Sequence, residues 1–137
     1  MIQRFAKAAA APIISGRVIK GRGYGRTLGF PTANLDRRQW ARLKAKPKLG
    51  VWAGTAEIKN GKYKNKKFLA GIVIGPLGPA GLPAIEAHLL DFEGNLYGQR
   101  VELGLKKFLR VYKQFVSMPS LKRQIAKDIR LVRYYGN

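Results

Sequence analysis

LGVWAGTAEIKNGKYKNKKFLAGIVI, residues 49–74, holds the strongest local signal in the chain. Its two ends, residues 49–58 and 67–74, are rich in the β-branched and aromatic residues that favour strands. Between them stands Asn60-Gly61, a dipeptide typical of a two-residue hairpin turn, because both central positions of that turn need a positive φ. We therefore predict an antiparallel hairpin here, and with it a mainly β fold.

Further strand signals flank this hairpin. Residues 13–20 are rich in β-branched side chains and end at a glycine cluster. Residues 84–92 alternate apolar and polar side chains with the period of two expected of a half-buried strand. Gly and Pro dominate residues 75–83, which we expect to form a loop.

The end of the chain combines two more strand signals with one helix. The pattern predicts a returning strand over 96–103 and a short strand near 107–111. Four apolar residues then recur on one helical stripe: Leu121, Ile125, Ile129 and Val132. Ser117 is the expected N-cap of this helix and Gly136 its expected stop. Six short antiparallel strands and one terminal helix predict a small barrel with a helical lid.

The composition fits one globular domain with an unusual charge. The 137 residues include no cysteine and one histidine, which excludes a disulfide framework, a thiol nucleophile and a multi-histidine metal site. Lys and Arg number 27 against 7 Asp and Glu, a formal net charge of +20. Such a charge indicates a polyanionic partner. However, the window 76–100 is net negative, which suits a phosphate-transfer site better than a general nucleic-acid coat.

The start of the chain bears on location and domain layout. The longest apolar run is far short of the ~20 residues needed to span a bilayer, and residues 1–12 resemble a signal peptide only weakly. We therefore expect a cytoplasmic protein that does not insert in a membrane, with an N-terminal tail over 1–12 and one domain over 13–137.

Three glycines occupy alternate positions in KGRGYGR, residues 20–26. Gly21, Gly23 and Gly25 allow backbone N–H groups to approach an anion closely, and Arg26 adds a cation. The segment lacks the Gly-Lys-Ser/Thr of a Walker loop and the glycine spacing of the dinucleotide fingerprint. From the glycines alone, an anion-binding loop and a flexible basic turn both stay open.

Residues 28–35 read LGFPTANL. Pro31 stiffens the segment and holds the Thr32 hydroxyl and the Asn34 amide two residues apart in extended backbone. Both are neutral oxygen ligands, which suit Mg²⁺ that also carries waters and nucleotide phosphate oxygens. The alternative is a proline-stiffened loop whose polar side chains bond their own backbone.

Glu86 lies in IEAHLLDF, residues 85–92, inside the acidic window. It is a candidate general base for a hydroxyl, provided that it lies within hydrogen-bond reach of the substrate. His88 shares its face of a regular strand, and we expect it to orient or pack rather than to catalyse. The alternative is that Glu86 simply marks the solvent face of the strand.

Cations and aromatic rings alternate in KKFLRVYKQF, residues 106–115, which includes Arg110 and Phe115. Such a run can stack a flat heterocycle. It is equally typical of a strand-to-helix junction with a hydrophobic seam.

Together these segments resemble the riboflavin kinase (flavokinase) family. The resemblance rests on the glycine loop, LGFPTANL, EAHLLDF at 86–92, LYG at 96–98 and the tail from Leu109 to Asp128, in family order over roughly residues 14–130. It implies a six-stranded antiparallel Greek-key barrel with a C-terminal α-helix. It also implies transfer of the ATP γ-phosphate to the 5′-hydroxyl of riboflavin, giving FMN and ADP.

The same resemblance implies a role for each candidate residue. Thr32 and Asn34 would hold Mg²⁺ and ATP, with Gly21, Gly23, Gly25 and Arg26 at the nucleotide, Glu86 as the base, and Arg110 and Phe115 at the flavin.

Departures from the family pattern keep other functions open. Many bacterial relatives carry an adenylyltransferase domain ahead of this one, and with only residues 1–12 before the barrel we do not expect adenylylation of FMN. Tyr112 stands where relatives commonly place an acid. The runner-up function is a non-catalytic basic barrel that binds RNA or another polyanion, and a third is a flavin- or nucleotide-binding module without transfer activity. The cationic surface favours a monomer.

Overall fold

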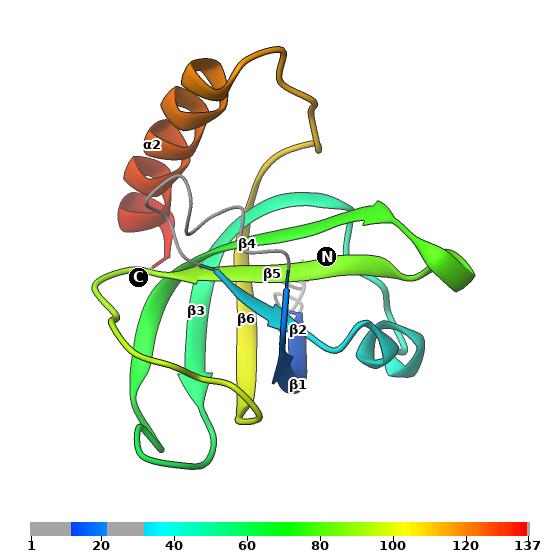
Figure 1. Ribbon diagram of the computed structural model, residues 1–137, viewed down its shortest axis with the longest axis vertical. Coiled ribbons are helices and arrows are strands. Elements are labelled where there is room, and N and C mark those ends of the chain that lie inside the picture. The colour runs from blue at the N-terminus through cyan, green and yellow to red at the C-terminus, as the bar shows by residue number, and fades with distance from the viewer. Residues whose placement is uncertain (1–11, 22–31, 137) are drawn as a thin grey trace, which may run out of the picture.

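The computed structural model describes residues 12–21 and 32–136, in which six strands close into a barrel and one helix packs on its outside (Figure 1). In chain order the strands are β1 Ile13–Ile19, β2 Ala33–Leu35, β3 Gly50–Ile58, β4 Lys67–Leu77, β5 Pro83–Leu89 and β6 Arg100–Arg110. The helix is α2, Met118–Tyr135, and two 3₁₀ turns, η1 Arg37–Arg42 and η2 Pro79–Gly81, lie in the connections.

The strand order around the barrel is β1-β2-β5-β4-β3-β6, and every neighbouring pair is antiparallel. β3, β4 and β5 follow one another as hairpins, and β6 returns by a longer connection to lie beside β3. This is the Greek-key arrangement. The predicted fold class is therefore confirmed.

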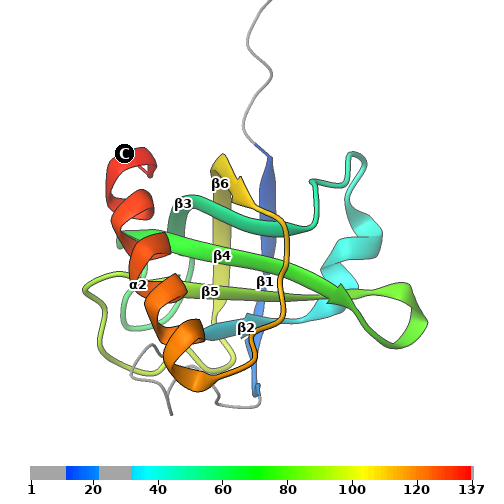
Figure 2. The ribbon, with the colours of Figure 1, turned by 90° about the horizontal axis from the view of Figure 1, so that it is seen from above.

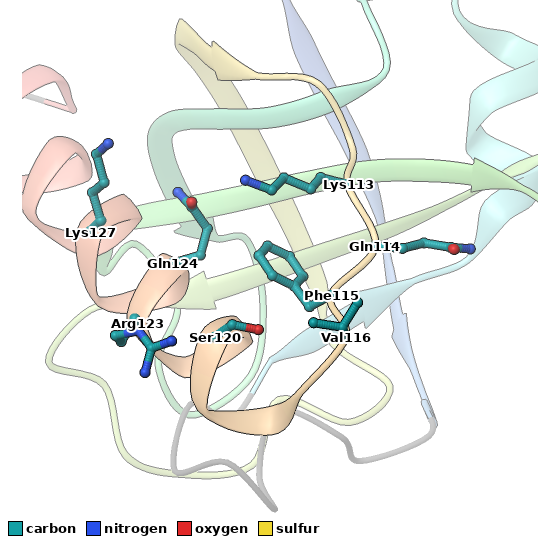
Figure 3. Close-up of a pocket in the computed structure, with 8 residues that line it drawn as sticks. All are labelled: Lys113, Gln114, Phe115, Val116, Ser120, Arg123, Gln124 and Lys127. Atoms are coloured by element: carbon teal, nitrogen blue, oxygen red, sulfur yellow. The ribbon is translucent and has the colours of Figure 1, made fainter.

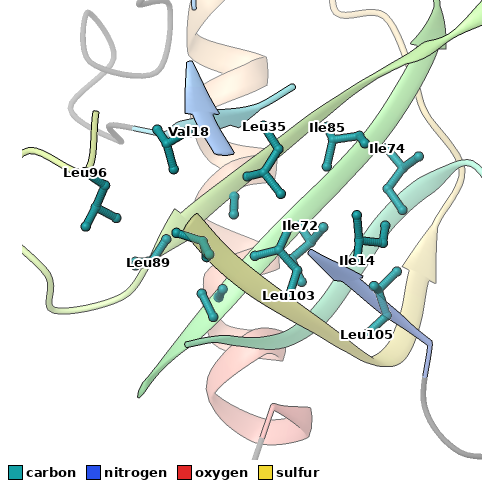
Figure 4. Close-up of a cluster of buried hydrophobic side chains, with 14 of the residues drawn as sticks. Ile14, Val18, Leu35, Ile72, Ile74, Ile85, Leu89, Leu96, Leu103 and Leu105 are labelled. Atoms are coloured by element: carbon teal, nitrogen blue, oxygen red, sulfur yellow. The ribbon is translucent and has the colours of Figure 1, made fainter. Parts of the chain in front are cut away.

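The barrel interior is filled by apolar side chains from every strand (Figure 4). In β5 the predicted alternation is observed: Ile85, Ala87 and Leu89 are buried, whereas Glu86 and His88 lie on the outer face, half-exposed. Burial of the inward set fixes the register, because a slip of one residue would exchange the two faces. The same constraint holds Glu86 outward.

The strand limits predicted at residues 58 and 67 are confirmed, but the tight two-residue turn predicted at Asn60-Gly61 is wrong, because the β3–β4 connection spans residues 59–66. The Asn60 side chain accepts a hydrogen bond from the Arg100 N–H at 2.9 Å, which ties this loop to β6. Two further boundaries are wrong. The two strands predicted near 96–103 and 107–111 are one strand, β6. Part of the predicted loop 75–83 belongs to β4, which continues to Leu77, and to β5, which begins at Pro83.

The turn η1 was not predicted. Asp36 caps it by accepting a hydrogen bond from the Arg38 N–H at 3.0 Å. Its Trp40 side chain is buried in the barrel core. A short polar stretch thus supplies one of the largest core side chains.

The predicted limits of α2 are confirmed. The Ser117 hydroxyl accepts a hydrogen bond from the Ser120 N–H at 3.2 Å, and the Gly136 N–H donates to the Val132 carbonyl at 2.8 Å. The helix lies along the outside of β3 and β4 (Figure 2), where Val132 packs with Ala53 and Leu90 in a second apolar cluster. Within the described residues, no helix has the length and apolarity to cross a membrane.

Candidate active site

Asn34 and Glu86 lie directly opposite each other on the outer face of the barrel. Asn34 pairs with Glu86 across β2 and β5, and with Ile19 across β2 and β1. Directly opposite residues on neighbouring strands place their side chains about 5 Å apart. Two segments more than fifty residues apart in the sequence are therefore brought into one site.

Gly21, two residues beyond β1, is in contact with the Asn34 side chain. A Cβ added at Gly21 would overlap the Asn34 amide nitrogen, so only glycine fits beside that amide as it stands. Close approach of backbone to a functional side chain is one of the uses of glycine. The start of the glycine segment and the end of LGFPTANL thus meet at Asn34.

Thr32 precedes β2 and is half-buried. Its separation of two residues from Asn34 places both on one face of extended backbone. Within residues 12–21 and 32–136, no group of three or more His, Cys, Asp or Glu side chains has a metal-binding arrangement. The neutral oxygens of Thr32 and Asn34 stay the candidate cation ligands here, and Glu86 pairs with Asn34 across the two strands.

One line of paired residues joins this site to Arg110 at the end of β6. Glu86 pairs with Val73, Val73 with Val51, and Val51 with Arg110. With strands about 4.8 Å apart, three steps separate Glu86 from Arg110 by about 14 Å along the sheet. A ligand that spans both positions has to be elongated.

A pocket of about 410 Å³ opens beside Arg110 (Figure 3), and we call it the helix pocket. It lies between the segment that crosses from β6 to α2 and the first turns of α2. Its lining residues are Lys113, Gln114, Phe115, Val116, Ser120, Arg123, Gln124 and Lys127. The walls combine one aromatic ring, amides and cations, which suits a flat heterocycle with polar edges.

Arg110 lies next to Phe115, one of the residues that line the helix pocket. Its Nε and Nη2 donate to the two carboxylate oxygens of Asp128 at 3.1 and 2.8 Å. Gln124 Nε2 donates to the same carboxylate at 3.0 Å, and the Arg110 guanidinium carbon lies 5.8 Å from the centre of the Phe115 ring. The two residues predicted for the flavin, Arg110 and Phe115, are therefore close together, and Asp128, which was not predicted, joins Arg110 to Gln124.

A family model for riboflavin kinase matches residues 9–135. The chain belongs to the riboflavin kinase family. It is 40% identical over 129 residues to a bifunctional riboflavin kinase/FMN adenylyltransferase of Buchnera aphidicola, covering 90% of this chain and 38% of that protein. It is also 35% identical over 124 residues to an RNA-binding riboflavin kinase of Bacillus subtilis, covering 88% of this chain and 49% of that protein. The chain thus spans less than half the length of these curated relatives.

Solved structures show the same fold. A riboflavin kinase from Trypanosoma brucei aligns over 96% of this chain and 81% of its own, with a TM-score of 0.65 and 22% identity. A protein from Streptococcus pneumoniae titled a macrolide-efflux protein aligns over 92% of this chain and 40% of its own, with a TM-score of 0.77 and 27% identity. The riboflavin kinase barrel is common to all three chains.

Not every candidate residue of this riboflavin kinase family member can be placed. Gly23, Gly25 and Arg26 lie outside the described residues. Gly21, Asn34 and Glu86 come together around β2, Thr32 lies on the same face as Asn34, and Arg110 and Phe115 meet at the helix pocket. The site is therefore divided into two parts on the outer surface of the barrel.

Asp128 and Gln124 are the site residues that sequence reasoning missed. Asp128 lies three residues after Ile125 and four before Val132, on the apolar stripe of α2. A carboxylate at a stripe position was the available signal, since a buried charge requires a partner. The partner, Arg110, was visible only as a basic residue eighteen positions earlier.

Proposed function

We propose that this chain transfers the γ-phosphate of ATP to the 5′-hydroxyl of riboflavin, giving FMN and ADP. The observation that carries the proposal is the meeting of Gly21, Asn34 and Glu86 around β2, in a chain of the riboflavin kinase family. The 5′ oxygen of riboflavin attacks the γ-phosphorus, and the bond from that phosphorus to the β-phosphate oxygen breaks. ADP departs with the electron pair of that bond, and the 5′-hydroxyl proton passes to Glu86.

Glu86 is suited to accept this proton because β5 fixes its position. Its neighbours in the barrel hold its register, and its side chain is half-buried on the outer face. Phosphoryl transfer depends mainly on positioning and on stabilisation of charge, with one residue that orients the attacking hydroxyl. A carboxylate on a strand meets that need better than one on a loop.

Thr32 and Asn34 fit an Mg²⁺ ion that arrives with ATP. Their oxygens are neutral, which suits an ion whose remaining ligands are water and phosphate oxygens. When bound, Mg²⁺ neutralises charge on the phosphates as the bond to the leaving group breaks. Contact with Gly21 restricts the Asn34 amide on its other side. Gly23, Gly25 and Arg26 are assigned to the nucleotide on sequence grounds.

The helix pocket fits the flavin ring. Phe115 supplies an aromatic wall, and the Arg110 guanidinium carbon lies 5.8 Å from the centre of its ring. The separation of about 14 Å between Glu86 and Arg110 along the sheet leaves room for the ribityl chain, which separates the riboflavin ring from its 5′-hydroxyl. One elongated substrate therefore reaches both parts of the site.

The decisive experiment measures FMN formed from riboflavin, ATP and Mg²⁺. Glu86→Gln should lower turnover about 100-fold or more, because it removes the proton acceptor, while MgATP affinity stays near that of the wild type. Glu102→Gln is a matched control, since Glu102 is a half-buried glutamate on the outer face of β6, opposite Ser15 and Glu57. Equal turnover of Glu86→Gln and wild type would remove Glu86 from its role, and a wild type that forms no FMN would reject the proposed function.

The nucleotide part of the site has a separate test in three alanine variants. Thr32→Ala and Asn34→Ala should weaken MgATP binding by removing oxygens, and Gly21→Ala should do so by displacing the Asn34 amide. Gly71→Ala is the control, because a Cβ there meets only Val132 at an ordinary 3.5 Å. Unchanged MgATP affinity in all three variants would place the metal and nucleotide elsewhere.

Binding of RNA is a second candidate function, supported by the distribution of charge. Residues 37–48 and 59–67 hold eleven of the 27 basic residues, mostly exposed: Arg37, Arg38, Arg42, Lys44, Lys46, Lys48, Lys59, Lys62, Lys64, Lys66 and Lys67. The single carboxylate within or beside residues 37–48, Asp36, is already bonded to Arg38. RNA affinity should fall steeply as the salt concentration rises, and it should also fall in a variant that combines Lys44→Glu with Lys46→Glu. It should be the same in Glu86→Gln as in the wild type. Affinity independent of salt would reject this function.

A further inference from the structure

Asp128 is the one charged residue that is buried among residues 12–21 and 32–136, with 7% of its surface exposed. A buried carboxylate is costly unless its oxygens are satisfied. Here both oxygens accept hydrogen bonds, from Arg110 and from Gln124. The carboxylate therefore joins the end of β6 to the second turn of α2.

The Nε and Nη2 edge of Arg110 is occupied. Both nitrogens donate to Asp128, and the third, Nη1, donates to the Val111 carbonyl oxygen at 3.4 Å, so three of the five N–H groups are engaged. The guanidinium carbon lies 5.8 Å from the centre of the Phe115 ring. Arg110 is thus placed to support Phe115 rather than to bind a ligand through the edge that faces Asp128.

The wall that carries Phe115 has few other supports. It belongs to residues 111–117, which form neither strand nor helix, and the neighbouring Val111, Tyr112 and Val116 are exposed. Across the helix pocket, Gln124 belongs to the facing wall (Figure 3). Asp128 bonds Arg110, which contacts Phe115 in one wall, and it also bonds Gln124 in the other wall, so it links the two walls.

We propose that Asp128 is a positioning residue for the flavin site: it holds Arg110 against Phe115 and holds Gln124 opposite, so that the helix pocket is formed before the ligand arrives. The identity of the ligand rests on the proposed function. A preformed pocket binds more tightly because less ordering is left to be done on binding. Asp128 therefore affects the affinity for flavin, and it does not affect the rate of phosphate transfer at Glu86.

The test is Asp128→Asn, which keeps the shape of the side chain and removes its charge. Quenching of flavin fluorescence gives the Kd for riboflavin and for FMN, and steady-state kinetics give the KM of each substrate. Flavin Kd and the KM for riboflavin should rise about tenfold or more, the scale set by small displacements of a binding wall. The KM for ATP and the turnover at saturating riboflavin should stay near wild type, a split that general loosening does not produce.

Asp91→Asn is the matched control. Asp91 receives the same two-bond fork from Arg133 of the same helix, but both partners are exposed and neither lines the helix pocket. Its flavin Kd should equal that of the wild type. Arg110→Lys keeps the positive charge but cannot donate two bonds to Asp128. If Asp128→Asn does not fold, the flavin Kd of Arg110→Lys is measured in its place. The effects of the two variants should not add in the double variant.

The outcomes separate the two proposals. If the wild type makes FMN while Asp128→Asn and Arg110→Lys keep wild-type flavin affinity, the positioning role is wrong and the proposed function stands. If Asp128→Asn raises the KM values of riboflavin and ATP equally, the residue is structural only, and the positioning role is again wrong. If the wild type neither binds flavin nor makes FMN, both the proposed function and the positioning role of Asp128 are wrong.

Discussion

Two arginine–aspartate pairs fasten α2 to the rest of the chain, one through Asp128 in the middle of the helix and one through Arg133 in its last turn. At the helix pocket, Arg110 bonds Asp128 with side chains that are 21% and 10% exposed. Near the C-terminus, Arg133 bonds Asp91 with side chains that are 51% and 74% exposed. In both pairs one guanidinium donates two bonds to one carboxylate, through Nε and Nη2 in Arg110 and through Nη1 and Nη2 in Arg133. The main differences are burial and the additional bond that Asp128 accepts from Gln124.

The difference decides what each pair can do. Water competes for both partners of an exposed pair, so breaking it returns each to good solvation and costs little. Breaking a buried pair leaves one charge without solvent or partner. The Arg110–Asp128 pair therefore specifies one arrangement of strand end and helix, while the Arg133–Asp91 pair adds little to the position of the helix.

The largest expected effect is that of Asp128→Ala on stability. Removing the carboxylate leaves Arg110 and Gln124 without their acceptor in a mostly enclosed space. We expect the free energy of unfolding to fall by about 3 kcal/mol, the lower end of the range for breaking a buried pair. Urea unfolding at neutral pH measures it. A loss equal to that of Asp91→Ala would show that burial does not separate the two pairs.

Ser117→Ala loosens the pocket end of α2 without touching either pair. It removes the hydrogen bond that the Ser120 N–H donates at 3.2 Å, and the loss of such a cap costs about 1 kcal/mol. If Asp128 rather than the cap positions the helix pocket, flavin affinity should change far less than in Asp128→Asn. Parallel urea unfolding and flavin titration of this variant compare the two contributions directly.

Most of the barrel was readable from the sequence because five of its six strands carry a local signal, whereas β2, which is only three residues long, was not predicted as a strand. Residues 84–92 alternate apolar and polar side chains, and only one strand register buries all the apolar ones. The helix is marked by a serine N-cap and by a glycine at its C-terminal end. The tight turn predicted at Asn60-Gly61 failed because a local pattern does not show long-range contacts. The loop that contains Asn60 is tied to β6 by the bond from the Arg100 N–H.

The two parts of the candidate site differ in the same way. Glu86 and Asn34 could be named because each stands in a distinctive local segment, and the barrel then brings them together. The role of Asp128 could not be predicted, because it depends on the contact with Arg110. That contact forms only when α2 packs against the barrel. Local pattern predicts which side chains a strand presents, but not which distant charges meet.

Asp91→Asn should have a small effect that salt removes. The Arg133–Asp91 pair is exposed, so its contribution is screened as ionic strength rises. The melting temperature of this variant should fall slightly below that of the wild type at low salt and coincide with it at high salt. The deficit of Asp128→Ala should persist at both, because a buried pair is screened much less. A deficit in Asp91→Asn that salt leaves unchanged would contradict this assignment.

The smallest expected effect is a change in the melting temperature at acidic pH, caused by protonation of the aspartates in the surface ion pairs. Bonds from Arg38 lower the pKa of Asp36 to about 2, and a bond from Arg133 lowers the pKa of Asp91 below its ordinary value. A carboxyl whose pKa is lowered by folding adds stability above its unfolded pKa, near 4, and loses that contribution as pH falls toward its folded pKa. Between about pH 4 and pH 2 the melting temperature of the wild type should therefore fall more steeply than that of Asp36→Asn, which has no proton to take up at this position. Parallel curves for the two proteins over that range would mean that the Arg38–Asp36 pair, like many exposed pairs, contributes nothing measurable to stability.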